Sequence, residues 1–460
     1  MRVVHVPFGY YPDPVGGTEV YVADLATALR SHGIESVIAA PALGAEPSTY
    51  MHGGAPVHRF PVGRVRDVAD LYGEGDPAAA AAIDRVLAET SPDVLHLHAF
   101  TSASSLHALR AAHRRGVAVA FTYHTPTASC VRGTLLRDGR VPCDGALLEQ
   151  RCASCLLESR GAGDAVRATL SRIPTAVGSA VASAGGTGPW VTALRARELT
   201  RLRHDAFRRL LDEADAVVAV CEWVRSLLLR AGARPSVVTL SRQGTSARAS
   251  GETRPRRSGS LRLAFMGRLH PTKGVHVVVK ALVSNPTLPA TLDVFGVAQD
   301  ADALRYEPDL RALVGHDARI RILPAVATSD VVPTLTSYDA TVVPSQWLET
   351  GPLTVLESFA AGVPVIGSNL GGIAELVAHD RDGWLVAHAD VAAWASALER
   401  LAGDAALVAR LTAGVRPPRT MTDVARDMAS IYGTIARAPR EPGGIGSGLR
   451  DGGILTSGAV

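Results

Sequence analysis

The sequence predicts an α/β chain with two doubly wound parallel sheets that face each other across a cleft. Three observations support this prediction. Short apolar segments alternate with helical segments through residues 1–240, the alternation resumes at residue 261, and 460 residues are too many for one ordinary domain. Such alternation is typical of a parallel sheet covered on both faces. Two such sheets in one chain form a natural cleft between them.

The first unit, residues 1–240, opens directly on an apolar strand. We expect its strands at residues 3–7, 37–40, 94–98, 117–123 and 216–220. We expect its helices at residues 18–31, 78–89, 104–115 and 223–231. Residues 125–212 break this rhythm, because they hold four of the five cysteines and Ala- and Arg-rich helical stretches. We therefore expect an insertion there.

The second unit spans residues 261–418 and follows a linker at 241–260, where residues 246–260 are largely Ser, Gly, Arg and Pro. We expect its strands at residues 261–266, 291–295, 320–323, 340–343 and 364–368. We expect its helices at residues 276–283, 353–361 and 391–401. A last helix at 419–438 can pack back on the first unit, and the Gly-rich tail at 439–460 is expected to be disordered.

The composition excludes several classes of function. Lys plus Arg number 47 and Asp plus Glu number 44, so the net charge is +3 and no nucleic-acid partner is expected. The sequence has no run of eighteen apolar residues, so no membrane span is expected. Because no signal-peptide pattern precedes the first strand, we expect a cytoplasmic protein.

The strongest candidate site begins with a predicted helix N-terminus. Gly351 precedes Pro352, which suits the first helical position, and Gly362 ends the helix. The helix follows a strand end, so its free N–H groups should point into the cleft. Such groups attract an anion, for example a phosphate.

Two glutamates flank this helix N-terminus. Glu349 lies in the preceding loop, and Glu357 lies about a turn and a half into the helix. Carboxylates repel phosphate but accept hydrogen bonds from sugar hydroxyls. A loop cap for Glu349 and a solvated face for Glu357 are the structural alternatives, and spacing alone does not decide between them.

A pair of cations lies in the loop after the first strand of the second unit. Arg268 and Lys273 should project at the carboxyl end of that sheet, where ligands bind and two cations can neutralise a diphosphate. The alternative is a pair of surface charges. Lys273 is one of only two lysines in the chain, the other being Lys280, which favours a role for it.

Two features of the first unit are also expected to face the cleft. Gly16 and Gly17 form a tight strand-to-helix turn that lets backbone N–H groups approach a ligand. This turn is not the GxGxxG pattern of dinucleotide-binding proteins. His98 and His124 end neighbouring strands, where a histidine can bind substrate or relay a proton, although strand-end histidines are often structural.

The cysteines Cys130, Cys143, Cys152 and Cys155 have the spacing C-x12-C-x8-C-x2-C. Because disulfides are rare in the cytosol, the spacing predicts a structural metal site of four thiolates. Zinc is the expected metal, and an iron–sulfur cluster is the alternative. Four protein thiolates leave no open position, so we expect no catalytic role for this metal.

A basic stretch at residues 195–209 carries six arginines on a predicted helix. It could dock on anionic lipid, at the inner face of the membrane, or on a phosphorylated acceptor. Because acidic residues are interspersed with the arginines, a solvated helix face is the favoured interpretation.

Several of these motifs together resemble the signature of retaining glycosyltransferases of family 4. The segment from Glu349 to Glu357, followed by Ser-Phe-Ala-Ala-Gly-Val-Pro, resembles the family's paired-glutamate motif. The stretch from Gly267 to Gly274 resembles its diphosphate-binding turn, and Gly16-Gly17 resembles its glycine-rich loop. The resemblance implies a GT-B fold of two Rossmann-like domains, with acceptor binding in the first and a nucleotide-diphosphate sugar held by the second.

The resemblance also implies roles for individual residues. Glu357 should hold the ribose, Glu349 the donor sugar, and Arg268 and Lys273 the leaving diphosphate. His124 should lie near the transferred sugar. These roles imply front-face substitution without a catalytic metal, in which the leaving phosphate helps to deprotonate the acceptor.

The backbone is expected to contribute as well. The N–H groups of Gly351 and Leu353 should contact sugar and phosphate, whereas Pro352 has no N–H to donate. The acceptor stays open among a glycan, a lipid-linked molecule and a small molecule. Two other functions also stay open: a sugar-nucleotide epimerase, which the glutamate pair disfavours, and a non-catalytic sugar-nucleotide-binding protein.

Overall fold

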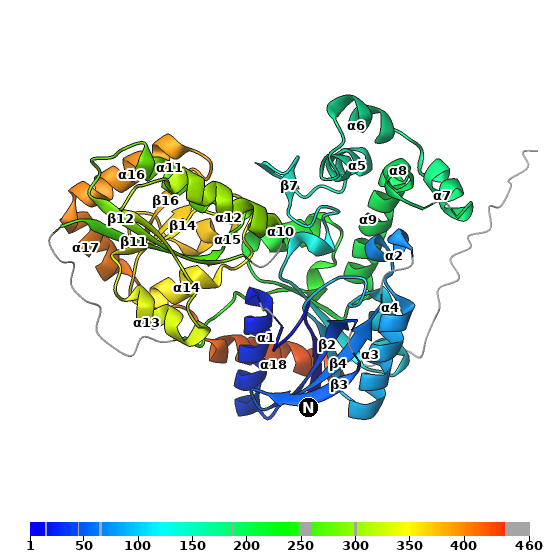
Figure 1. The fold of residues 1–460 in the computed structure, drawn as a ribbon. Helices are drawn as coiled ribbons and strands as arrows, with labels where there is room; N and C mark the ends of the chain where they lie inside the picture. Colours follow the sequence, from blue (N-terminus) through cyan, green and yellow to red (C-terminus); the bar gives the residue numbers. More distant parts are fainter. Residues whose placement is uncertain are drawn as a thin grey trace, which may run out of the picture.

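Two parallel sheets, side by side in Figure 1, organise the computed structural model. The first sheet has eight strands in the order β10-β9-β6-β5-β1-β2-β4-β3, and the second has six in the order β13-β12-β11-β14-β15-β16. The structure describes residues 1–13, 16–44, 46–63, 67–185, 187–247, 259–298 and 301–437. The predicted disordered tail and residues 248–258 of the predicted linker lie outside the described residues.

The strands of the first sheet are β1 (Arg2–Val6), β2 (Glu35–Leu43), β3 (Ser48–His52), β4 (Ala55–Val62), β5 (Val94–Leu97), β6 (Ala118–Tyr123), β9 (Ala216–Ala219) and β10 (Val238–Leu240). All neighbours are parallel except β3, which runs antiparallel to β4 at the sheet edge. The sequence did not predict this hairpin, because β3 is mostly exposed and therefore lacks an apolar run.

Helices cover both faces of the first sheet. They are α1 (Gly17–Leu29), α2 (Val68–Tyr72), α3 (Pro77–Thr90), α4 (Leu106–Arg114), α9 (Ala196–Glu213) and α10 (Glu222–Arg230). The last helix of the described chain, α18 (Met421–Arg437), lies beside α1 (Figure 1), and its Met428 and Tyr432 share one buried core with Leu25 of α1. The chain thus returns to its first unit after completing the second.

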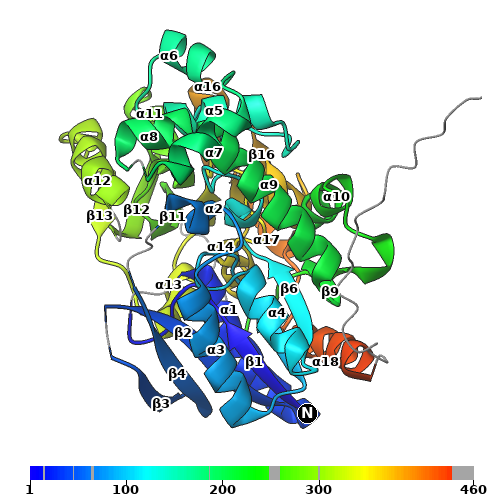
Figure 2. The same ribbon diagram turned by 90° about the vertical axis from the view of Figure 1, so that its right-hand side faces the viewer.

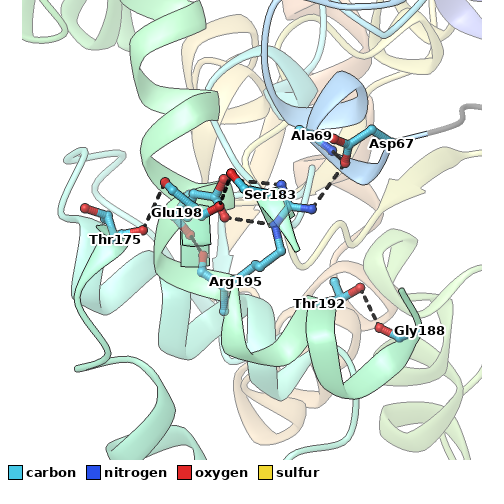
Figure 3. A network of polar contacts seen from close by, with 11 residues as sticks. Asp67, Ala69, Thr175, Ser183, Gly188, Thr192, Arg195 and Glu198 are labelled. Atoms are coloured by element: carbon cyan, nitrogen blue, oxygen red, sulfur yellow. Dashed lines mark hydrogen bonds and ion pairs between the residues drawn. The ribbon is translucent and has the colours of Figure 1, made fainter. Parts of the chain in front are cut away.

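The segment predicted to be an insertion forms a helical arm at one end of the molecule, as Figure 2 shows. Its elements are β7 (Leu136–Arg137), β8 (Val141–Pro142), α5 (Glu149–Glu158), α6 (Asp164–Leu170), α7 (Thr175–Ser183) and α8 (Pro189–Leu194). The base of the arm is fixed by a buried ion pair between Arg195 and Glu198 at 2.8 Å. Arg195 also reaches Asp67 at 3.2 Å (Figure 3). Ten of the eighteen residues of α9 are buried, so the predicted basic helix packs against the protein along most of its length.

The strands of the second sheet are β11 (Leu261–Arg268), β12 (Ala290–Val297), β13 (Ile320–Leu323), β14 (Ala340–Val343), β15 (Val365–Ser368) and β16 (Gly383–Val386). Its helices are α11 (Val275–Val283), α12 (Ala301–Val314), α13 (Val331–Leu335), α14 (Leu353–Ala360), α15 (Gly371–Leu376), α16 (Val391–Gly403) and α17 (Ala405–Gly414). Its core consists mainly of Val, Leu and Ala around the fully buried Trp394. No helix of the described chain is long and apolar enough to cross a bilayer.

Strand order reverses once in each sheet, between β1 and β5 in the first and between β11 and β14 in the second. In doubly wound sheets, ligands bind outside the carboxyl ends of the strands at these reversal points. The loops that follow β1, β11 and β14 are the ones in which the sequence places Gly16-Gly17, Arg268 to Lys273, and Glu349. The topology therefore places these loops where a ligand site is expected.

Candidate active site

A cavity of about 570 Å³ lies between the two sheets and is lined from both units. Ten of the eleven residues expected at the cleft lie in its walls: Gly16, Gly17, His124, Arg268, Lys273, Glu349, Gly351, Pro352, Leu353 and Glu357. The fold thus brings together residues from distant parts of the chain.

Lys273 and Glu349 form an ion pair inside this cavity, with the Lys273 Nζ 2.7 Å from a carboxylate oxygen of Glu349. Ser345 Oγ donates a second hydrogen bond of 2.7 Å to the same oxygen. Glu349 is buried, which by itself would raise its pKa. The Lys273 ammonium, together with the Trp347 and Ser345 side chains, outweighs burial and holds the pKa of Glu349 below its ordinary value.

Two helix N-termini meet at the cavity. Gly16 caps α1, where its N–H donates to the Glu19 carboxylate at 2.8 Å, and α14 begins across the cleft at Leu353. The first residues of the two helices approach closely, since a Cβ added to Gly17 would lie 3.6 Å from a Leu353 methyl carbon. Both helices direct unbonded N–H groups toward this region, which favours an anionic ligand.

The position of Pro352 corrects one detail of the sequence analysis. Pro352 is the N-cap of α14, with ψ of 113°, and Leu353 takes the first helical position that was predicted for Pro352. The extended ψ keeps Pro352 outside the helix. The predicted end of the helix is confirmed, because Gly362 follows it with φ of 71°.

Glu357 lies on α14 and faces the first unit across the cleft. Burial, together with the carboxylate of Asp24 on α1, raises the pKa of Glu357 from its ordinary 4.5 to about 7. Among the described residues no cation lowers the pKa of Glu357, so the carboxyl is partly protonated near pH 7. Such a group suits a neutral hydrogen-bonding ligand, for example a sugar hydroxyl. The solvated-face alternative for Glu357 is therefore disfavoured.

Replacing Glu357 by Gln is expected to stabilise the protein at pH 8 and to weaken nucleotide binding. The raised pKa means that folding disfavours the ionised carboxyl, so stability falls as pH rises from about 4.5 to 7. The variant avoids this loss, which is worth up to about 3 kcal/mol. Thermal melts at pH 5, 6.5 and 8 should show a gap between the two proteins that widens with pH, and a constant gap would contradict this explanation.

His124 directly follows β6 and is buried at the cavity wall. Its backbone carbonyl accepts a 2.7 Å hydrogen bond from Thr350 Oγ1 of the second unit, so the two units are tied together beside the cavity. Burial lowers the pKa of His124 to about 3, and the ring is therefore neutral. His98, expected to face the cleft as well, lies behind His124 and does not line the cavity.

Comparison with protein families decides what kind of protein has this cavity. Residues 16–243 match the model described as glycosyl transferase 4-like domain, and residues 260–404 match glycosyl transferases group 1. Together these matches cover most of the chain. The chain belongs to the glycosyltransferases.

Curated relatives agree with this family but differ in how much they align. The D-inositol 3-phosphate glycosyltransferase of Stackebrandtia nassauensis is 33% identical over 185 residues, which is 38% of this glycosyltransferase and 42% of that protein. The chain therefore spans well under half the length of this relative. The glycogen synthase of Mycobacterium tuberculosis is 25% identical over 472 residues and aligns over 96% of this chain and 97% of its own.

Solved structures establish the fold. Sucrose-phosphate synthase from Thermosynechococcus elongatus aligns with a TM-score of 0.65 and 18% identity, over 94% of this chain and 98% of its own. Anabaena Alr3699/HepE, solved with UDP and glucose, aligns with a TM-score of 0.62 and 16% identity, over 94% and 99%. With two Rossmann-like parallel sheets, this glycosyltransferase has the predicted GT-B fold.

The sequence analysis missed contacts that join the two units of the glycosyltransferase. Trp223 of α10 donates from its indole N–H to the backbone carbonyl of Glu349 at 2.9 Å. The Glu375 carboxylate accepts the backbone N–H groups of Glu222 and Trp223, both at 2.8 Å, and so caps α10 from the opposite unit. In the sequence, Glu375 is a carboxylate near the end of α15, and nothing there reveals a partner in the other unit.

The cysteines of the insertion are free thiols that differ in their surroundings. Within the described chain, no three of the sulfurs of Cys130, Cys143, Cys152 and Cys155 lie within 4.8 Å of one another. Cys152 and Cys155 instead contact the backbone oxygens of Ala146 and Leu136 at 3.9 and 3.6 Å. Burial, with a smaller effect of Cys130, raises the pKa of the other three. The predicted metal site is thus not preassembled here.

Proposed function

We propose that this glycosyltransferase moves a sugar from a nucleotide-diphosphate donor to a hydroxyl acceptor with retention of the anomeric configuration. The observation that carries the proposal is the Lys273–Glu349 ion pair, which lies in one cavity with two helix N-termini and the partly protonated Glu357. This arrangement offers cationic groups and N–H donors for a diphosphate and carboxylates for sugar hydroxyls.

In the proposed reaction, Arg268 and Lys273 neutralise the negative charge that develops on the diphosphate as its bond to the anomeric carbon breaks. The acceptor oxygen then bonds to the same face of that carbon, and its proton passes to a phosphate oxygen of the leaving group. Glu349 holds the sugar hydroxyls and Glu357 the ribose. Since the two cationic side chains supply the charge, the proposal includes no divalent metal ion, and activity should persist in EDTA.

Thermal melts with UDP, GDP, ADP and TDP, each at about a hundred times its dissociation constant, test the donor site. A specific nucleotide should stabilise the protein by about 2.7 kcal/mol. The corresponding nucleotide sugars then identify the sugar, because a transferase without acceptor slowly hydrolyses its donor. Binding without hydrolysis would support the sugar-nucleotide-binding alternative, an altered sugar would support the epimerase alternative, and no melting shift would contradict the site.

We further propose that the acceptor is lipid-linked and that the arm contacts a membrane. Between Arg172 and Arg195 the chain has no charged residue, and α6, α7 and α8 bury only Gly178. Trp190 is 79% exposed. An uncharged, exposed helical tip beside exposed arginines such as Arg172 suits the interface of an anionic bilayer.

Sedimentation with phosphatidylglycerol vesicles tests this membrane contact. Trp190→Ser should weaken vesicle binding about tenfold, because it removes an aromatic anchor from the bilayer interface. Leu304→Ser is the matched control, since Leu304 is 65% exposed but lies on α12 of the second unit. Equal binding by both variants, or none by the unmodified protein, would contradict the proposal.

The insertion is also proposed to bind one zinc ion through Cys130, Cys143, Cys152 and Cys155. The support is the spacing of these four cysteines within one short segment of the chain. Free thiols fit a reducing compartment, so we place the enzyme at the cytoplasmic face of the membrane. Metal analysis of the purified protein distinguishes zinc from an iron–sulfur cluster and from no metal.

A further inference from the structure

A row of buried histidines crosses the first sheet and ends at the cavity. His124 directly follows β6, His98 directly follows β5, and His5 lies on β1. These strands are neighbours in the sheet, and Ser36 of the next strand, β2, completes the row. The contacts are His124 Nε2 to His98 Nδ1 at 3.1 Å, His98 Nε2 to His5 Nδ1 at 3.0 Å, and His5 Nε2 to Ser36 Oγ at 3.3 Å. At the cavity end, Gln243 Nε2 lies 3.3 Å from His124 Nδ1.

The protons in such a row are interdependent. A neutral imidazole has one N–H donor and one acceptor nitrogen, so each histidine that accepts on one side must donate on the other. The Gln243 amide donates to His124 Nδ1, which leaves the proton of His124 on Nε2. His124 then donates to His98, His98 to His5, and His5 to Ser36.

Burial keeps the whole row neutral. The three imidazoles are at most 5% exposed, and burial lowers the pKa of His5 and His124 to about 3 and that of His98 well below its ordinary value. Besides one another, these rings face His96 and Tyr21, which are also buried. No charged side chain of the described residues is hydrogen-bonded to the row.

His5, His96 and His98 also place ring nitrogens within 4.8 Å of one another, which raises the alternative of a metal site. Each of these nitrogens already has a hydrogen-bond partner. His96, for example, bonds Tyr432 at 2.6 Å and Thr122 at 2.7 Å. A metal ion would have to displace several of these bonds, so the hydrogen-bonded row accounts for the geometry better.

We infer that His5 and His98 are positioning residues that fix His124 as its Nε2–H tautomer. The Nδ1 lone pair of His124 is thereby kept for one donor at the cavity wall, which is the Gln243 amide in this structure and would be a hydroxyl of a bound sugar that takes its place. That a sugar binds there rests on the proposed function, whereas the tautomer of His124 does not. His5 lies outside the cavity lining, so its effect on the site passes through His98 and His124.

Long-range proton–nitrogen spectra of protein labelled with ¹⁵N-histidine, recorded without nucleotide or sugar, test this inference. The unmodified protein should show His5, His98 and His124 neutral at pH 6, each with the proton on Nε2. His5→Leu leaves His98 Nε2 without an acceptor, and the signal of His124 should then become a mixture of tautomers. His5→Gln should restore the single tautomer, because its amide can accept from His98 and donate to Ser36.

His96→Leu is the matched control, since His96 is equally buried on β5 but bonds Tyr432 and Thr122 outside the row. It should leave the tautomer of His124 unchanged even if it lowers the melting temperature. An Nδ1–H tautomer of His124 in the unmodified protein, or no response to His5→Leu, would overturn the inference. The inference would also be overturned if the unmodified protein contained a stoichiometric metal ion that His5→Leu had lost. Because no ligand is present, these results do not depend on whether the proposed donor binds.

Discussion

Replacing Lys273 by Met is expected to weaken nucleoside diphosphate binding by at least tenfold and to lower transfer by about 10²- to 10³-fold. The ammonium is a charged group that the proposed mechanism aims at the leaving diphosphate, and one such group is worth about this much in other enzymes. The variant should also lose stability. Glu349 is buried, and without Lys273 its charge would face only neutral hydrogen-bond donors such as Ser345.

The double variant Lys273→Met, Glu349→Gln separates the two effects. Leaving a buried carboxylate unpaired costs about 3–5 kcal/mol, and neutralising Glu349 should recover most of it. Nucleotide binding should stay weak, because the cation is still absent. Lys280→Met is the control, since Lys280 is the other lysine and is exposed on α11. Calorimetric titration and thermal melts measure these effects, and normal nucleotide affinity in Lys273→Met would contradict the assignment.

The residues of the cavity could be predicted because local sequence rules place them. A glycine turn after a strand, a short helix that starts after a strand end, and cations in a strand-to-helix loop all lie at the carboxyl edge of a parallel sheet. Gly16, Lys273 and Glu349 follow three such strands, and the topology then brings them together. These predictions did not depend on how the two sheets are placed relative to each other.

Contacts between the units could not be predicted in this way. The bonds from Trp223 to Glu349 and from Thr350 to His124 depend on the relative placement of two independently patterned sheets. His98 shows a related limit. Strand periodicity placed it at the sheet edge, but only the packed structure shows that His124 covers it and that it bonds His5 instead of facing the cavity.

Replacing Gly274 by Ala is expected to destabilise the second unit by about 3 kcal/mol or more and to disrupt the site. Gly274 joins the turn that holds Lys273 to α11 and has φ of 73°. A Cβ at this position would lie 1.9 Å from the carbonyl oxygen of Pro344 and 2.8 Å from the Gln346 side chain. The left-handed backbone costs about 1 kcal/mol for alanine, and displacing the neighbouring backbone adds about 1–3 kcal/mol.

Gly33→Ala separates the cost of the left-handed backbone from the cost of displacing neighbouring atoms. Gly33 has φ of 67°, close to that of Gly274, but nothing lies within 4 Å of its added Cβ. It should therefore lose only about 1 kcal/mol and keep normal nucleotide affinity. Because the residues displaced by Gly274→Ala lead directly to Glu349, that variant should lose nucleotide affinity together with stability. Urea denaturation and nucleotide titration of both variants measure this difference, and equal losses would mean that backbone conformation alone requires glycine at both positions.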